Sequence, residues 1–369
     1  MKIAILGTRG VPNYYGGFEQ FAEFFSVYLV EKGHEVYVYN SHNHPFQEKL
    51  FHGVHILHQN DPEHKMGTFG QFIYDYNCII DSRKRNFDII LQLGYTSNSI
   101  WFPLLPKKSI IITNMDGLEW KRTKYSRPVQ QFLKFAERLA AMSSDYLVSD
   151  SLGIQSFLKK QYKKDSTFIA YGAHPFEHPN EALLAHYDVE KGKYNMIMAR
   201  FEPENNLDMV LEGVSLNEDD KTTILVVGNH NTKYGEYLKG KFKYFPHIRF
   251  IGGVYNIDHL DNLRYFSNLY FHGHSVGGTN PSLLEAMASK ALVIAHDNDF
   301  NKGILKDNAY YFSSAAQVTN ILKTIQKNDN LPMVESNYEA IINEYNWEKI
   351  NGEYLQLFED CFAKTQARK

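Results

Sequence analysis

The sequence predicts an α/β protein made of two doubly wound, Rossmann-like domains that face a central cleft. Its length of 369 residues exceeds what one ordinary hydrophobic core holds. Short apolar runs, typical of buried parallel strands, alternate with helical patterns, and the polar stretch 175–192 interrupts this alternation once. We expect a first domain over residues 1–180, a second over 190–345, and a C-terminal helix at about residues 346–369 that packs back on the first.

Composition and charge restrict the class of protein. The chain is 43% hydrophobic and 22% charged, as folded soluble proteins are. Its formal net charge of -3 provides no basic field, so we expect no nucleic-acid partner. The two cysteines lie far apart without metal-like spacing, which indicates a reducing compartment. No apolar run reaches the ~20 residues of a membrane span, so we expect a cytoplasmic protein, with peripheral contact at the inner face of the cell membrane left open.

The first domain opens with the strand, glycine-rich loop, helix and strand of a doubly wound fold. The continuous apolar run 2–6 predicts a buried strand, and the periodicity of 18–32 predicts a helix that Gly33 ends as a C-cap. Further strands are expected at 36–39, 54–57, 88–93, 109–113, 146–149 and 167–170, and helices at 69–83, 129–141 and 151–161.

The second domain repeats the alternation. Strands are expected at 194–199, 222–227, 248–251, 269–271 and 292–295, and helices at 207–213, 257–267, 282–289, 316–327 and 334–362. Ligands of open parallel sheets bind beyond the carboxyl ends of the strands. The glycine-rich loops 7–17 and 274–280 both follow strands, so each is expected to hold a substrate.

The stretch 272–288, H-G-H-S-V-G-G-T-N-P-S-L-L-E-A-M-A, has the pattern of an anion site. Gly277 and Gly278 let the backbone approach a ligand, Asn280 is a good N-cap, and Pro281 fits the first helical position. Outward N–H groups and the helix dipole favour a phosphate there. The alternative is a glycine-rich turn that only connects a strand to a helix.

Three side chains are expected beside this anion site. Arg200 ends a strand and is placed to clamp a diphosphate; the alternative is a surface arginine paired with Glu202 or Glu204. Glu285 lies near the start of the helix, within reach of a sugar or ribose hydroxyl. His274 alternates with a second histidine along a strand and is expected to touch the ligand.

Two further strand ends carry candidate residues. In I-G-G-V-Y at 251–255, backbone groups such as those of Val254 are placed to read a nucleobase edge and Tyr255 to pack on the base, although an ordinary turn explains the segment equally well. Asp116 and Glu119 follow the strand at 109–113, where a general base or a hydroxyl-orienting carboxylate would lie. Their alternatives are a helix-capping Asp116 and a solvated Glu119.

The first loop, 7–17, is a candidate site for phosphate or for a sugar acceptor. Arg9 is a cation among glycines, and Gly16 and Gly17 precede a helix. Gly10 and Tyr15 belong to the same loop. The G-x-G-x-x-G spacing of dinucleotide sites is absent, which disfavours a nicotinamide oxidoreductase.

Metal and membrane contacts have weaker signals. Histidine pairs such as His42/His44, His58/His64 and His272/His274 lack metal-site spacing, so neither a metal nor a cofactor is expected. The basic stretches 120–127 and 159–164 are either solvated faces or contacts with an anionic membrane surface that holds a lipid-linked acceptor.

Four motifs together give a resemblance. They are G-T-R-G-V-P-N-Y-Y-G-G-F-E from Gly7, D-G-L-E-W from Asp116, A-R-F-E-P-E-N-N from Ala199 and H-G-H-S-V-G-G-T-N-P-S from His272. With P-S-L-L-E-A-M-A, the sequence resembles the retaining family 4 glycosyltransferases of GT-B fold. The four motifs are similar to a subgroup of bacterial rhamnosyltransferases that build capsule and cell-wall polysaccharides.

The resemblance implies roles in the second domain and departs from the family at two positions. Glu285 matches the second glutamate of the family's E-x7-E pair, which binds the nucleotide ribose, and Arg200 matches the phosphate-binding arginine. The first glutamate's position is Gly277, so backbone N–H groups up to Thr279 would replace its carboxylate. The arginine's usual lysine partner falls at Asn205, which removes a positive charge.

The function implied is transfer of rhamnose from deoxythymidine-diphosphate rhamnose (dTDP-rhamnose), with retention and without a metal, onto a glycan or lipid-linked saccharide. Asp116, near the position of a family histidine, and Arg200 would be catalytic. The expected donor-binding residues are Arg200, Asn205, Val254, Tyr255, His274, Gly277, Gly278, Thr279, Asn280 and Glu285, and the expected acceptor-binding residues are Arg9, Gly10, Tyr15, Gly16, Gly17 and Glu119. Alternatives are a GT-B sugar-nucleotide epimerase and a non-catalytic nucleotide-sugar-binding protein.

Overall fold

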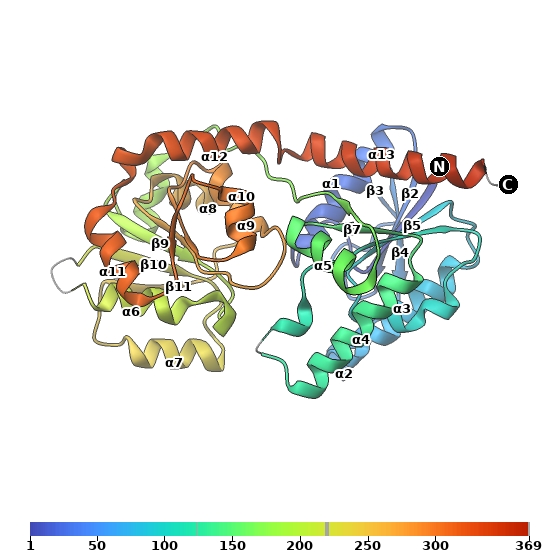
Figure 1. Cartoon of the computed structure of the whole chain (residues 1–369), viewed down its shortest axis with the longest axis horizontal. Coiled ribbons are helices and arrows are strands. Elements are labelled where there is room, and N and C mark those ends of the chain that lie inside the picture. Colours follow the sequence, from blue (N-terminus) through green and yellow to red (C-terminus); the bar gives the residue numbers. More distant parts are fainter. Residues whose placement is uncertain (123, 218–220, 368–369) are drawn as a thin grey trace. The chain divides into compact units, whose positions relative to one another are not determined.

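The computed structural model describes residues 1–367 except 123 and 218–220, and the chain forms two compact units (Figure 1). The first unit comprises Met1–Trp120, Ser126–Tyr171 and Trp347–Lys369, and the second comprises Lys121–Tyr125 and Gly172–Asn346. Thr123 of the basic stretch and residues 368–369 of the expected C-terminal helix lie outside the described residues.

The main segment of the second unit begins at Gly172, earlier than the expected end of the first domain at residue 180. Hydrogen bonds explain the difference. The Phe176 N–H donates to the Ala288 carbonyl (3.1 Å), and the Asn180 N–H donates to Asn262 Oδ1 (2.6 Å). These bonds hold the start of the polar stretch on the second unit.

The first sheet has the strand order β3-β4-β2-β1-β5-β6-β7-β8. Its strands are β1 (Lys2–Leu6), β2 (Glu35–Ser41), β3 (Leu50–Phe51), β4 (Val54–Gln59), β5 (Ile89–Leu93), β6 (Ile110–Asn114), β7 (Tyr146–Ser149) and β8 (Thr167–Phe168). All pairs are parallel except β3 with β4, a short hairpin that the sequence pattern did not predict. Because β1 lies between β2 and β5, the chain changes direction across the sheet beside β1.

Helices cover both faces of this sheet (Figure 1). They are α1 (Gly17–Glu31), α2 (Glu63–Met66), α3 (Phe69–Ser82), α4 (Arg127–Ser143), α5 (Leu152–Tyr162) and α13 (Trp347–Gln366), with 3-10 turns η1 (Ser99–Leu104) and η2 (Glu119–Lys121). On one face α1 packs on α13 through aromatic rings: Phe21 and Phe25 lie 4.7 and 5.2 Å from the Tyr354 ring. On the other, α3 packs through Cys78 and Ile79.

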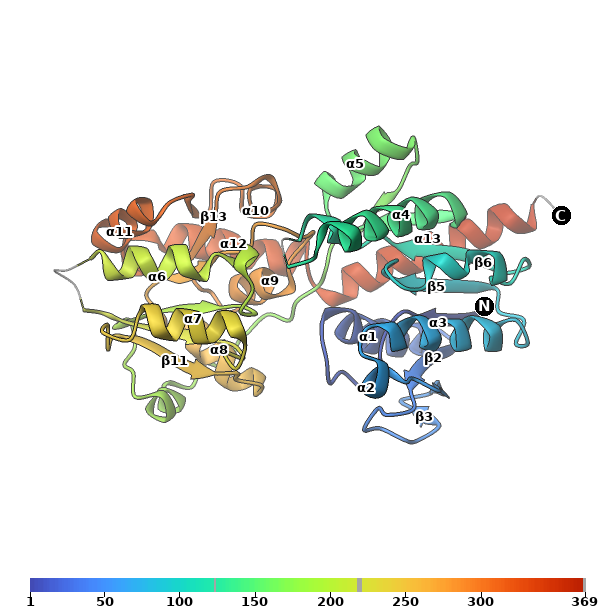
Figure 2. The ribbon, with the colours of Figure 1, turned by 90° about the horizontal axis from the view of Figure 1, so that it is seen from below.

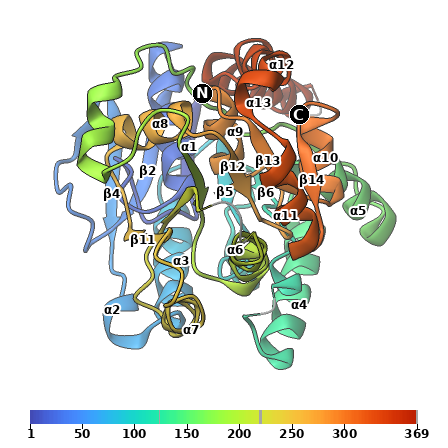
Figure 3. The same cartoon turned by 90° about the vertical axis from the view of Figure 1, so that its left-hand side faces the viewer.

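The second sheet is parallel throughout, with the order β11-β10-β9-β12-β13-β14. In Figure 3, β11 lies at one edge, and β12, β13 and β14 follow in that order toward the other. Its strands are β9 (Tyr194–Met198), β10 (Thr223–Val227), β11 (Ile248–Gly252), β12 (Tyr270–His272), β13 (Val293–His296) and β14 (Tyr310–Phe312). The edge strand β14 was not predicted. The expected strands at 194–199, 222–227, 248–251, 269–271 and 292–295 are confirmed within about one residue at most ends.

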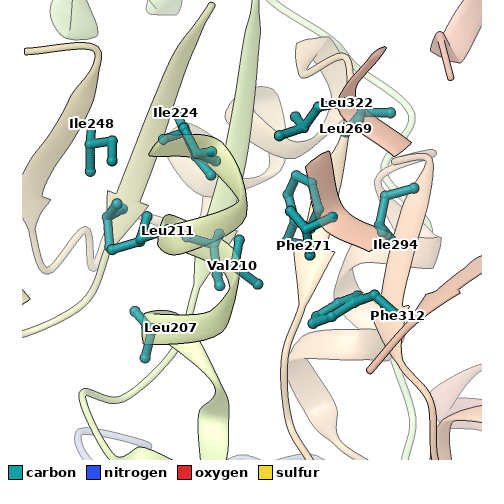
Figure 4. Packing of buried hydrophobic residues seen from close by; sticks show 14 of the residues in the cluster. Leu207, Val210, Leu211, Ile224, Ile248, Leu269, Phe271, Ile294, Phe312 and Leu322 are labelled. Atoms are coloured by element: carbon teal, nitrogen blue, oxygen red, sulfur yellow. The ribbon is translucent and has the colours of Figure 1, made fainter. Parts of the chain in front are cut away.

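Side chains from strands and helices fill the core of the second unit (Figure 4). Its helices are α6 (Leu207–Ser215), α7 (Lys233–Lys241), α8 (Ile257–Phe266), α9 (Pro281–Ala288), α10 (Asp299–Leu305), α11 (Ala315–Thr324) and α12 (Leu331–Asn343), with 3-10 turns η3 (Glu181–Tyr187), η4 (Pro203–Asn205) and η5 (Lys327–Asn330). Helices α6 and α7 lie in front of the sheet in Figure 2. A Cβ at Gly213 of α6 would come within 2.5 Å of Val318, so α6 and α11 pack closely.

The expected helix 334–362 is two helices, α12 and α13, separated at residues 344–346. The Tyr345 carbonyl accepts a hydrogen bond from the Ala173 N–H (2.8 Å), and Ala173 forms a parallel bridge with Asn346. The extended backbone that this pairing requires interrupts the helix. Among the described residues, none of the helices combines the length and hydropathy of a membrane span.

Candidate functional site

The loop between β12 and α9 lies at the carboxyl edge of the second sheet. Gly277 has φ of 137°, a backbone conformation that L side chains rarely adopt. Any side chain at position 277 would therefore be strained. Asn280 occupies the N-cap position of α9, but its side chain makes no capping hydrogen bond.

A second loop, between β9 and α6, anchors this one. The Ser275 N–H and Oγ both donate to the Glu204 carbonyl (3.0 and 2.8 Å), and Asn206 Nδ2 donates to the Gly273 carbonyl (2.7 Å). A Cβ at Gly273 would come within 2.1 Å of the Asn205 carbonyl oxygen. The two loops therefore form one rigid edge.

Asn205 belongs to the anchor of that edge. Its side chain is buried, and Nδ2 donates to the Arg200 carbonyl (2.8 Å). Because this bond occupies the Asn205 Nδ2 group, the side chain holds the Arg200 backbone in place.

Arg200 follows β9 and is exposed. Within the part of the chain that the structure describes, its guanidinium makes no hydrogen bond or ion pair. The alternative pairing with Glu202 is not formed, because Glu202 pairs with Lys124 (3.6 Å) of the segment 121–125. Glu204 is buried in η4. The positive charge of Arg200 is thus exposed at the end of β9, the strand next to β12.

His274 is held between these groups as a neutral imidazole. Burial, and then the charges of Arg200 and Arg122, lower its pKa to about 3. Asn298 and Asn301 donate to its carbonyl (3.0 and 3.1 Å). Its ring stacks on His272 with 4.4 Å between centroids, as their shared strand face predicts. Its Nδ1 is buried without a partner among the described residues.

Glu285 is oriented by an arginine that sequence reasoning missed. Arg264 is fully buried; its Nη2 donates to Glu285 Oε2 (2.5 Å) and its Nη1 to Asp261 Oδ1 (2.9 Å). Glu285 Oε1 has no partner in the described residues and is not enclosed by protein. A ligand hydroxyl could donate to it. The available signal was that Arg264 falls on the apolar face of α8 with Leu260, four residues earlier.

Val254 and Tyr255 follow β11, which is an edge strand of the second sheet. Tyr255 is 89% exposed and folds over Gly253, where a Cβ would lie 2.8 Å from its hydroxyl. Strands β10 and β9 separate β11 from β12, a span of about 14 Å at ordinary strand spacing. Glu285, however, is held by Arg264 of α8, the helix that begins two residues after Tyr255.

In the first unit, a carboxylate balances the positive charge of Arg9. Its Nε and Nη2 donate to the two oxygens of Glu63 (3.1 and 2.9 Å), and the guanidinium stacks 3.7 Å above the Tyr15 ring. Its N–H donates to Glu19 Oε1 (2.9 Å). Glu63 was not predicted, because it lies in a polar stretch without periodicity. Arg9 is therefore not an unpaired cation like Arg200.

The glycines of this first loop differ in what they require. Gly10 has φ of 129° and lies against Asn40, whose Cγ would be 2.3 Å from a Cβ at position 10. Gly16 is extended, with φ of -170°, and precedes Gly17, the first residue of α1. Asn13 Oδ1 accepts from the N–H groups of Tyr15 and Gly16 (2.9 and 3.2 Å). Those two amides are thus used within the loop.

Asp116 and Glu119 follow β6 at the carboxyl edge of the first sheet. Asp116 has φ of 50°, and its N–H donates to Asn114 Oδ1 (2.9 Å). Glu119 is only 8% exposed, and its N–H donates to the Tyr95 hydroxyl (3.1 Å). The alternative of a solvated Glu119 is therefore wrong.

No group of three or more metal-ligating side chains gathers within the residues that the structure describes. Of the basic stretches, Lys124 pairs with Glu202, and Lys159 pairs with Asp165 (2.5 Å). Lys121 and Arg122 also have partners. These pairings do not test membrane contact.

Two family models match parts of the chain. Residues 185–347 match the family model "Glycosyl transferases group 1", and residues 103–174 match "Domain of unknown function (DUF1972)". No curated protein matches the sequence. The structure is similar to sucrose-phosphate synthase from Thermosynechococcus elongatus (TM-score 0.80, 14% identity, covering 98% of this chain and 99% of that chain).

Two further solved structures show the same similarity. A glycosyltransferase from Rickettsia africae ESF-5 has a TM-score of 0.70 at 17% identity, covering 98% of each chain. HepE from Anabaena, in complex with UDP-glucose, has a TM-score of 0.73 at 14% identity, covering 100% of each chain. The predicted GT-B fold is confirmed.

Proposed function

We propose that this chain is a glycosyltransferase that moves a sugar from a nucleotide-sugar donor to a saccharide or lipid-linked saccharide acceptor. The observation that carries the proposal is the exposed, unpaired Arg200 beside a glycine-rich helix N-terminus, with Glu285 fixed by a buried arginine. All three features lie in the region that matches the glycosyl transferases group 1 model. Retention of configuration at the transferred carbon and independence from metal are part of the proposal.

The donor would extend along the carboxyl edge of the second sheet. Arg200 and the first N–H groups of α9 would bind the diphosphate, which suits an anion at a helix N-terminus. Glu285 Oε1 would accept from a ribose hydroxyl, and Tyr255 would pack on the base. Stabilisation of the leaving diphosphate would be the main catalytic contribution. The neutral His274 would add a hydrogen bond without adding charge.

We further propose dTDP-rhamnose as the donor. The support is the resemblance at the four motifs to rhamnosyltransferases. Gly277 adds to it, since the wall that carries a glutamate in the wider family consists of backbone here. HepE was solved with UDP-glucose, so uridine donors are the natural comparison. Asp116 in the first unit would orient the reacting sugar or acceptor.

Peripheral association with the inner face of the cell membrane is also proposed for the cytoplasmic enzyme. The support in the first unit is the cations of the stretch 159–164 and the side chains Phe135 and Met142 of α4, which are 53% and 58% exposed. The cations of the stretch 120–127 are a separate support. Basic and apolar side chains together favour an anionic lipid surface.

A panel of nucleotide sugars in a thermal-shift assay tests the donor, since a ligand that binds the native state stabilises it by mass action. We expect dTDP-rhamnose to raise the Tm most, above UDP-glucose and free dTDP. Incubation of the best donor without an acceptor separates the alternatives. A new nucleotide sugar would indicate an epimerase, and binding without turnover on any acceptor would indicate a binding protein.

A further inference from the structure

The first unit has its own ligand-binding position, at the point where the sheet changes direction. Strand β1 pairs with β2 on one side and β5 on the other. Open parallel sheets bind ligands at such a switch point, beyond the carboxyl ends of the two strands. Thr8 follows β1, and Ser97 follows β5. Neither was singled out from the sequence.

A carboxyl group from α3 reaches this position. Asp75 is 6% exposed, and its Oδ2 accepts from the Ser97 Oγ (2.5 Å). Its neighbour Tyr74 donates to the Thr8 and Tyr39 carbonyls (3.1 and 2.9 Å), which fixes α3 against the end of β1. Asp75 Oδ1 has no partner in the described residues and keeps some solvent exposure.

Two polar atoms nearby in the fold are buried without a hydrogen-bond partner in the described part of the chain. They are Thr8 Oγ1 and Oε1 of Gln92 on β5, in residues that are 3% and 4% exposed. Buried polar atoms in folded proteins almost always have a partner. A ligand at the switch point would supply one to Thr8.

The charge around the switch point selects the ligand. Burial raises the pKa of Asp75 to about 7; Ser97 and Arg9 oppose this shift and Asp61 adds to it. The cation Arg9 is already bound by Glu63. The remaining carboxylates, Glu19 and Asp61, are unfavourable for an anion. Hydroxyl groups, which donate to carboxylates, fit this surrounding.

We propose that Asp75, oriented by Ser97, accepts a hydrogen bond from a hydroxyl of a neutral saccharide acceptor, with Thr8 Oγ1 as a second contact. The proposal rests on the proposed function and names the acceptor end of that reaction. It assigns Asp75 as an acceptor-binding residue and excludes a phosphate or carboxylate at this position.

The test uses the full chain with dTDP-rhamnose, or the best donor from the panel, and p-nitrophenyl glycosides of neutral sugars, with p-nitrophenyl glucuronide as the anionic comparison. We expect Asp75→Asn to lower kcat/KM for the neutral glycosides about 10- to 100-fold, as loss of a hydrogen bond to a charged group does. Ser97→Ala should lower it less. The donor-induced Tm shift should not change, since donor residues lie in the second unit.

Asp81→Asn is the matched control. It lies on the same helix but pairs with Arg85 (2.5 Å) and accepts from the Tyr39 hydroxyl (2.9 Å) rather than from Ser97, so it should keep wild-type kcat/KM. Wild-type kcat/KM in Asp75→Asn, or a wild-type preference for the glucuronide, would overturn the proposal. If Asp75→Asn does not fold, Ser97→Ala decides by the same criteria.

A separate readout keeps the inference distinct from the proposed function. If the wild-type protein transfers to none of the glycosides, saturation-transfer NMR measures their binding directly. Binding of neutral glycosides that Asp75→Asn weakens would support the subsite although transfer fails. Equal binding by both proteins would overturn it.

Discussion

The two glycine-rich loops, one in each unit, occupy similar positions between a strand and a helix but differ in the charges around them. Each follows a buried strand and precedes a helix, α1 in the first unit and α9 in the second. In the second unit the cation Arg200 is exposed and unpaired among the described residues, while the carboxylate Glu285 is bound by Arg264. In the first unit the cation Arg9 is bound by Glu63. Glycines thus mark where a ligand approaches, and the ion pairs decide its charge.

The largest effect is expected when the buried support of Glu285 is removed. Arg264→Met should lower the free energy of unfolding by about 3–5 kcal/mol, because Glu285 and Asp261 lose their shared cation in a buried site. Chemical denaturation of both proteins measures it. Lys241→Met is the control, since Lys241 also pairs with two carboxylates, Asp208 and Glu212, but is a third exposed. A loss in Arg264→Met no larger than the control's would contradict the assignment.

Removing the unpaired cation tests the other side of the comparison. Arg200→Ala should lower kcat/KM for transfer about 100- to 1000-fold with little change in stability, the range seen when one donor to developing negative charge is deleted. Steady-state rates with the natural or best donor measure it. Arg249→Ala is the control, because Arg249 lies on β11 and donates to the Asp188 carbonyl (2.9 Å). Full activity in Arg200→Ala would show that Arg200 does not bind the diphosphate.

The neutral imidazole beside Arg200 gives a pH dependence. Since the pKa of His274 falls from 6.5 to about 3 on folding, the unfolded chain binds more protons between those values. The stabilising contribution of the neutral form is therefore present at pH 7.5 and lost as the pH falls below 6.5. His274→Asn should reduce this acid loss by about 1 kcal/mol at pH 5.5.

Denaturation at pH 7.5 and 5.5 compares His274→Asn with wild type and with the exposed-site control His178→Asn. A variant whose stability falls as steeply as wild type would show that His274 is not held neutral. Asp75 in the first unit has the opposite pH dependence of stability. The raised pKa of Asp75 gives stability that is lost as the pH rises from 3.8 through about 7.

The smallest effect is expected at the ion pair of the first loop. Glu63→Gln should cost less than about 1 kcal/mol, because both side chains are more than a quarter exposed. It leaves Arg9 without its carboxylate, so the loop becomes more like that of the second unit. We expect the rate on p-nitrophenyl glucuronide relative to a neutral glycoside to rise severalfold. An unchanged ratio would show that Arg9 does not face the acceptor.

The fold was predictable because its central strands are continuous apolar runs. Strands such as β5 and β6 are buried along their whole length, so their signal survives without knowledge of their neighbours. The breaks in the pattern were harder. The antiparallel β3 has two residues, and the interruption at 344–346 depends on Ala173, far away in sequence. Local periodicity contains no information on such pairings.

The sequence predicted the motif residues of the candidate site but not the residues that orient them through tertiary contacts. Arg200 and Gly277 lie in motifs where residue type and position coincide, and Arg200 is exposed as a ligand-binding cation would be. Arg264, Glu63 and Ser97 act through partners 21, 54 and 22 residues away. Which carboxylate each partner reaches depends on tertiary packing. A sequence pattern gives the type of a group but not its neighbour.

The left-handed backbone at Gly277 limits which residues this loop can accept. A glutamate placed at 277 would be strained at φ of 137° before its carboxylate could contact any sugar. Relieving that strain would require changes at the anchors of the loop, because Glu204 and Asn206 hold it through Ser275 and Gly273. In the terms of a double-mutant cycle, substitutions at 277 and at these anchors are expected to be non-additive.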